Sequence, residues 1–167
     1  MPELQRLRAD HAPAVLAFEL ANRAYFAAVI SDRGDEFFDQ FTERHNDLLA
    51  EQEAGICIFH VLIGDDGSVL GRFNLFDVKD GTANLGYRVA QHAAGRGVAT
   101  ATVTELCQLA AAQYGLHTLR AATAHQNVAS QKVLIKAGFV PAGPAGPADL
   151  GGKHGTWYQR DLTADQP

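Results

Sequence analysis

The stretch LGYRVAQHAAGRGVAT, residues 85–100, decides how the chain is interpreted. It begins as a short strand that ends at Val89, passes through a turn with glycines at positions 95 and 97, and then opens a helix. The first turn of a helix leaves backbone N–H groups unpaired and carries a partial positive charge, and glycines let a ligand approach the backbone closely. The stretch therefore predicts a site for a phosphate or pyrophosphate, to which Arg96 can add a charge-assisted contact.

A glycine-bearing turn of this kind is compatible with more than one structure. Taken alone, two glycines are better explained by a tight turn without a ligand. A dinucleotide-binding fingerprint fits poorly, because Thr100 stands where the third glycine is needed and no acidic residue follows about twenty residues on. A P-loop is excluded, because no Gly-Lys-Ser/Thr follows the glycines.

A second motif, HQNVAS over residues 125–130, opens another predicted helix, which KAGF, residues 136–139, brings to an end. Asn127 and Ser130 are three residues apart, so both side chains lie on one side of the helix start. Taken alone, this spacing is explained by an N-cap asparagine and a solvated serine.

Hydrophobic periodicity around these motifs predicts a mixed α/β chain. We expect one domain over residues 1–162 and a frayed tail over 163–167. The segment PAGPAGPADLGG, residues 141–152, is too rich in Pro and Gly for regular structure. The expected strands are 4–7, 56–63, 69–78, 84–89, 119–123, 139–140 and 156–162, and the expected helices are 10–25, 37–54, 98–114 and 127–137.

Composition narrows the classes of function. Lys and Arg number 14 against 19 Asp and Glu, a net charge of −5, which disfavours nucleic-acid binding driven by bulk charge. No apolar stretch approaches the ~20 residues that span a bilayer, and the N-terminus has no apolar signal region, so we expect a cytoplasmic protein with no membrane partner. Cys57 and Cys107 are expected to be buried and reduced, His45 and His60 to be core residues, and no His/Cys spacing predicts a metal site.

Together, LGYRV, GRGVAT, NVAS and KAGF resemble the GNAT superfamily of acetyl-CoA-dependent N-acyltransferases. The likeness is greatest to the branch that acetylates the N-terminal amines of ribosomal proteins, and it is dense from about Val69 to Phe139. It implies a GNAT-like α/β fold, with a mixed, mostly antiparallel sheet splayed at its centre and flanked by helices. It also implies acetyl-CoA as co-substrate and no metal.

The resemblance implies roles for individual residues. The pantetheine arm would bond to the main chain near Tyr87 and Val89, and Asn127 would hold it. A main-chain N–H near Tyr87 would polarise the thioester carbonyl, and Ser130 would lie near the sulfur and protonate the departing thiolate. Main-chain donors to the CoA pyrophosphate would come from Gly95, Arg96, Gly97, Val98, Ala99 and Thr100.

The general base is the point at which this sequence departs from the family. The ribosomal branch often has Glu two residues before Gly-Tyr, and this chain has Asn84, which cannot accept a proton. Asp77, on the neighbouring predicted strand, is the candidate base, and Glu36, His125 and a chain of waters are the alternatives.

The function expected from the resemblance is transfer of an acetyl group from acetyl-CoA to a primary amine, by direct attack through a tetrahedral intermediate. The acceptor is a protein N-terminus or a small molecule, and the protein is expected to be a monomer or homodimer. The alternative is a non-catalytic acyl-CoA-binding module on the same fold, which Asn84 favours and Ser130 disfavours.

Overall fold

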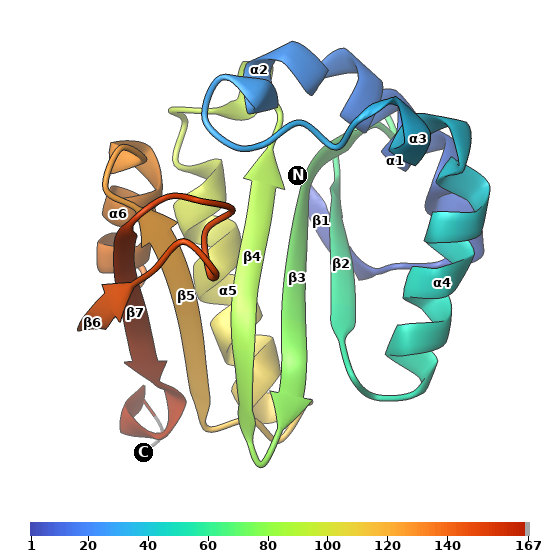
Figure 1. Cartoon of the computed structure of the whole chain (residues 1–167). Helices are drawn as coiled ribbons and strands as arrows, with labels where there is room; N and C mark the ends of the chain where they lie inside the picture. Colours follow the sequence, from blue (N-terminus) through green and yellow to red (C-terminus); the bar gives the residue numbers. More distant parts are fainter. Residues whose placement is uncertain (166–167) are drawn as a thin grey trace. The chain divides into compact units, whose positions relative to one another are not determined.

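The computed structural model describes residues 1–165, which form two compact units (Figure 1). The first unit comprises residues 1–74 and 87–94. The second comprises residues 75–86 and the chain from Gly95 onward. Strands β3 (Val69–Lys79) and β4 (Thr82–Val89) contribute residues to both units. The expectation of one domain over 1–162 stays a prediction.

Seven strands are hydrogen-bonded in the order β1-β2-β3-β4-β5-β7-β6. The pairs β1/β2, β5/β7 and β6/β7 are antiparallel, and β4/β5 is parallel. This mixed, mostly antiparallel sheet with flanking helices confirms the predicted fold class. The remaining strands are β1 (Glu3–Arg6), β2 (Ile58–Ile63), β5 (Thr118–Ala124), β6 (Val140–Ala145) and β7 (Gly155–Asp161).

Each of the two long helices predicted in the first unit is split in two. The first becomes α1 (Ala12–Ala21) and α2 (Arg23–Ala27), and the second becomes α3 (Asp35–Asp39) and α4 (Phe41–Glu53). The break after α1 falls at Asn22, whose backbone leaves the helical region at φ −108° and ψ 9°. Its buried side chain donates to the carbonyl of Phe18 at 2.9 Å and accepts from the N–H of Gln91 at 2.9 Å. A contact across 69 residues therefore interrupts a helix that local periodicity treats as continuous.

The core of the first unit forms between its helices and strands. Val15, Phe18 and Phe26 are buried with Phe41 and Phe59, and Phe18 and Phe26 meet edge to face. Gln52 of α4 links the helix to its neighbours, since its amide donates to the carbonyl of Leu7 and its oxygen accepts from the N–H of Phe59. Phe41 is buried, whereas Phe37 is only partly buried against it.

The core of the second unit lies between α5 (Val98–Ala112), α6 (Val128–Lys136) and the strands that they cover. In Figure 1, α5 lies behind β5. Burial on α5 recurs at the helical period, at Val103, Leu106 and Ala110, and the chain turns away at Gly115, where φ is +65°. Cys107 is buried on the same helix and burial raises the pKa of its thiol, so it behaves as a core residue, as expected.

The segment 141–152 contradicts its prediction in part. Strand β6 (Val140–Ala145) extends into it and pairs with β7, with a register shift between Pro141 and Gly143. A strand at the sheet edge has one side free of pairing, so it tolerates prolines that lack an N–H. At the C-terminus, Leu162–Asp165 form a 3-10 helix, and residues 166–167 of the expected tail lie outside the described residues.

The buried histidine of β2 predicts an acid-sensitive fold. His60 is 1% exposed, and burial lowers its pKa to about 4. The unfolded chain takes up this proton below pH 6.5 and the folded chain does not, so folded stability falls as the pH drops from 6.5 towards 4, by about 3 kcal/mol in all. Urea unfolding of wild-type protein and His60→Gln across this range measures the effect. In His60→Gln, the free energy of unfolding is expected to lose this dependence on pH. In His92→Gln, where the substituted residue is exposed, the dependence is expected to remain.

Candidate active site

The GRG turn leads directly into α5, as predicted. Gly97 is the N-cap residue, and both Gly95 and Gly97 adopt positive φ, +74° and +77°. Apart from the glycine itself and its two chain neighbours, no atom lies within 4 Å of where a Cβ would stand on Gly95 or Gly97. The turn is therefore open above its backbone, and its conformation favours glycine at both positions.

The start of α5 has no side-chain cap. The first helical hydrogen bond runs from the N–H of Ala101 to the carbonyl of Gly97, at 3.0 Å. The N–H groups of Val98, Ala99 and Thr100 precede that bond, and they stand at the positive end of a 15-residue helix. Residues 98–100 are half-buried and residues 95–97 are exposed, which leaves this edge accessible to an anion.

Strands β4 and β5 pair over only three residues each. Thr82–Asn84 pair with Thr118–Arg120, and beyond this, within the described part of the second unit, Leu85 and Gly86 have no partner on β5. Within the second unit, the pairing between β4 and β5 therefore ends at Asn84 and Arg120. In the part of β5 that pairs with β7 but not with β4, Thr123 is 3% exposed and its hydroxyl has no hydrogen-bond partner among the described residues. The sequence did not predict this group, because a lone Thr in a strand carries no signal.

Asn127 and Ser130 are brought together at the start of α6. The side-chain Oδ1 of Asn127 accepts from the backbone N–H of Ser130 at 3.2 Å, so Asn127 is the N-cap that the spacing alone favoured. The bond uses Oδ1 of Asn127 and the backbone of Ser130. The Nδ2 donors of Asn127 take no part in it.

Tyr87 and Val89 belong to the first unit. The ring of Tyr87 stacks on Phe73, with centroids 5.6 Å apart and planes 10° from parallel, which leaves the side chain half-buried. In the second unit, Gly86 faces the ring of Phe76, because a Cβ on Gly86 would come within 3.0 Å of that ring. The glycine of the Gly-Tyr pair thus has a packing reason that is independent of any ligand.

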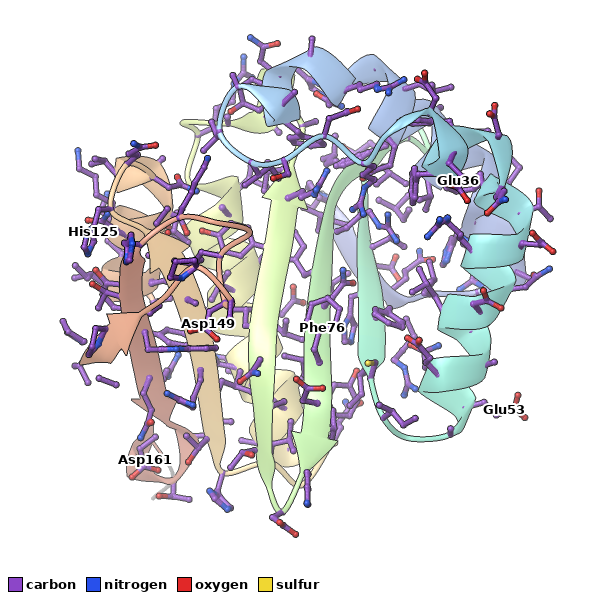
Figure 2. The ribbon with its side chains drawn as sticks, in the orientation of Figure 1. Glu36, Glu53, Phe76, His125, Asp149 and Asp161 are labelled. Atoms are coloured by element: carbon purple, nitrogen blue, oxygen red, sulfur yellow. The ribbon has the colours of Figure 1, made fainter. Side chains whose placement is uncertain are left out.

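The base candidates lie on separate elements. Asp77 is exposed on β3 with φ +51°, a left-handed conformation that is uncommon for a residue other than glycine. Asn84 is half-buried on β4. Figure 2 shows Glu36 on α3 and His125 just after β5; both are exposed, and the backbone N–H of His125 bonds to the carbonyl of His154 at 3.1 Å.

A charged cluster that the sequence did not predict surrounds Glu19 of α1. This carboxylate is 1% exposed, and Nε of Arg33 donates to both of its oxygens, at 2.9 and 3.1 Å. Arg72 of β3 and Arg88 of β4 approach one oxygen, Oε1, at 3.6 and 3.7 Å. Burial, followed by the charge of Arg33, lowers the pKa of Arg88 to about 10. The one feature of the sequence that could have indicated this cluster is a glutamate within the apolar run AVLAFELA.

The histidines expected in the core are there. His45 is 3% exposed, and its Nε2 lies 3.0 Å from the carbonyl of Arg8. Within residues 1–165, no group of three or more His, Cys, Asp or Glu side chains is arranged to hold a metal ion. No helix in that range is long and apolar enough to cross a membrane.

Comparison with known proteins identifies the class to which this fold and glycine turn belong. The model of the acetyltransferase (GNAT) domain matches residues 3–140. The chain belongs to the GNAT family and is an acetyl-CoA-dependent acyltransferase, so the family predicted from the motifs is confirmed. It is also similar to the probable N-acetyltransferase YjcK of Bacillus subtilis (strain 168), with 28% identity over 139 residues, 78% of this chain and 75% of that protein.

Three solved structures share the fold. The ribosomal-protein-S5-alanine acetyltransferase of Vibrio fischeri matches with a TM-score of 0.89 and 18% identity, over 99% of this chain and 96% of that one. RimJ of Mycobacterium smegmatis, in complex with CoA-disulfide, matches with a TM-score of 0.86 and 22% identity, over 98% of this chain and 83% of that one. The spermidine N-acetyltransferase of Vibrio cholerae, in complex with CoA and spermine, matches with a TM-score of 0.80 and 16% identity, over 97% of this chain and 96% of that one.

Proposed function

We propose that the protein transfers the acetyl group of acetyl-CoA to a primary amine by direct attack, through a tetrahedral intermediate. The observation that carries the proposal is the start of α5, which has no side-chain cap and follows two glycines with open space where a Cβ would stand. Such a helix start suits the pyrophosphate of CoA. Two of the solved structures that share the fold contain CoA or its disulfide.

The cofactor-binding residues in this proposal come from both motifs. The backbone from Gly95 to Thr100 donates to the pyrophosphate, and Arg96, which is exposed, adds a charge-assisted contact. Asn127 uses its Oδ1 for the helix cap and donates from Nδ2 to a pantetheine carbonyl. The main chain at Tyr87 and Val89 bonds to the pantetheine arm.

The chemistry requires three groups. The amine must be neutral to attack, so Asp77, or water in its place, accepts a proton. The N–H near Tyr87 stabilises the oxyanion that forms as the amine nitrogen bonds to the carbonyl carbon. The carbon–sulfur bond then breaks, and the hydroxyl of Ser130 gives its proton to the departing thiolate.

The acceptor is an amine on a protein N-terminus or on a small molecule. The Vibrio fischeri protein is a ribosomal-protein-S5-alanine acetyltransferase and the Vibrio cholerae protein is a spermidine N-acetyltransferase, so this fold serves both kinds of acceptor. The cytoplasmic location, the absence of a metal or nucleic-acid partner and the monomeric or dimeric state stay predictions.

Acetyl-CoA is expected to stabilise the protein by ~2.7 kcal/mol at a hundredfold excess over its dissociation constant. Thermal unfolding with and without acetyl-CoA measures this, and thiol release with a panel of amines measures transfer. Arg96→Gln is expected to weaken binding about tenfold, the loss of one charge-assisted contact, and Arg44→Gln, an exposed residue of α4, controls for net charge. A melting temperature that millimolar acetyl-CoA does not change contradicts the proposal. Stabilisation without thiol release from any amine favours the non-catalytic module.

A further inference from the structure

The cluster around Glu19 contains more positive charge than its one carboxylate can neutralise. Three guanidinium groups, those of Arg33, Arg72 and Arg88, surround one carboxylate, which leaves two charges unmatched within the cluster. Buried charges are normally paired, because removing an ion from water costs several kcal/mol. Arg33 lies at the surface, with its side chain 29% exposed, but Arg72 and Arg88 are more enclosed and share the one buried carboxylate, so their surplus charge requires a physical explanation.

Nearby acidic residues do not supply the missing charge directly. Asp32 accepts from Arg23 at 2.8 Å, and Asp35 accepts from the same guanidinium at 2.9 Å. These carboxylates belong to a separate ion-pair group, in which the side chain of Asp35 is 89% exposed. Asp32 acts on Arg88 only as the weakest of the charges that shift its pKa.

The three arginines do not approach Glu19 equally closely. Arg33 supplies the hydrogen bonds to Glu19, and Arg72 and Arg88 remain beyond 3.5 Å from its oxygen. The side chain of Arg72 is only 5% exposed and that of Arg88 is 18% exposed. Arg72 and Arg88 thus share one carboxylate that Arg33 already engages, and the positive charge left over can be matched by an anion from outside the protein.

We propose that Arg88, with Arg72 behind it, binds an anionic group, a carboxylate or phosphate, that is carried by the amine acceptor. The guanidinium fork of arginine matches both anions in a bidentate geometry. Glu19 and Arg33 hold the cluster in place, and the ring of Phe26, 5.1 Å from the Arg88 guanidinium carbon, supports its position. A polycationic acceptor such as a polyamine is disfavoured at this surplus of positive charge.

The inference rests on the proposed function, which assigns the thioester carbonyl to the main chain at Tyr87. Arg88 is the next residue along β4, so an anion bound there is held close to the point of acetyl transfer. An acceptor that carries its amine a few bonds from a carboxylate or phosphate fits this arrangement.

The test compares matched pairs of amines that differ in one charge. The probes are ω-amino acids with two to five methylene groups and the corresponding amides. Their binding to the wild-type protein, with and without CoA, is measured by calorimetry at constant ionic strength. The acid is expected to bind about 10- to 100-fold more tightly than its amide, a preference that falls to about threefold or less in Arg88→Gln and is unchanged in Arg44→Gln.

Acetate and inorganic phosphate are titrated as free anions, to separate an acceptor group from an ion that binds alone. Equal binding of acid and amide across the whole series overturns the inference, whether or not Arg88→Gln folds, because that comparison uses wild-type protein. Stabilisation by acetate or phosphate without an acid preference also overturns it, since the anion is then not carried by the acceptor. Acetyl-CoA binding and thiol release are recorded separately, so failure of the proposed function is distinguished from loss of the acid preference.

Discussion

Replacing Glu19 with Gln is expected to lower the free energy of unfolding by about 3–5 kcal/mol, because it removes the carboxylate that neutralises buried arginines. Arg72 is 4% exposed and Arg88 is half-buried, so neither guanidinium can move into water without disturbing β3 or β4. Glutamine has nearly the same shape as glutamate, so the loss reports charge and not packing. Urea unfolding at neutral pH measures it.

Glu36→Gln is the matched control, because Glu36 is an exposed glutamate of α3 in the same unit. It is expected to change stability by about 0.5 kcal/mol or less. If Glu19→Gln is as stable as Glu36→Gln, then Arg72 and Arg88 do not depend on the carboxylate. The account of the cluster as an excess of buried positive charge is then wrong.

Ser130→Ala is expected to lower kcat by about 10²–10⁴ and to raise the KM for acetyl-CoA much less. The hydroxyl would act on the thiolate only as charge develops on sulfur, so its contribution belongs to the transition state. The structure makes this test clean, because Asn127 caps α6 through the backbone N–H of Ser130, which alanine retains. Stability is therefore expected to change by less than ~1 kcal/mol.

Steady-state kinetics and melting temperature on one preparation decide the role of Ser130. Ser68→Ala, an exposed serine in the turn before β3, is the matched control and is expected to keep wild-type kcat. A loss below tenfold for Ser130→Ala would show that solvent protonates the thiolate, which is feasible for a thiol with a pKa near ~8.5. Ser130 would then be only a residue of the first helical turn.

Local signals were sufficient for the elements that carry the motifs. The sequence predicted that α5 begins at Val98 and that Asn127 caps α6, and the structure agrees. Both starts depend on conformations of single residues: a glycine at positive φ in one case and an amide that bonds three residues ahead in the other. A splay between β4 and β5 was expected from the family resemblance and not from the residues themselves, and it stays a prediction.

Elements without such local determinants were predicted less well. Strand β6 runs through prolines and glycines that favour a loop, and it exists because β7 supplies the partner for its hydrogen bonds. The end of α1 at Asn22 depends on a bond to Gln91, 69 residues away. In both cases pairing with a distant segment outweighs the conformational preference of the segment itself.

The sequence by itself determined the family, the two helix starts and the glycine turn, because each depends on the backbone conformation or side chain of neighbouring residues. Only the tertiary structure decided which charges meet. The charged cluster draws on four separate segments: Glu19 on α1, Arg33 in the loop after α2, Arg72 on β3 and Arg88 on β4. Their spacing in the sequence gives no indication that they are in contact. The energy of a buried ion cluster depends on distance and desolvation, and both are set only when the strands and helices of the first unit pack.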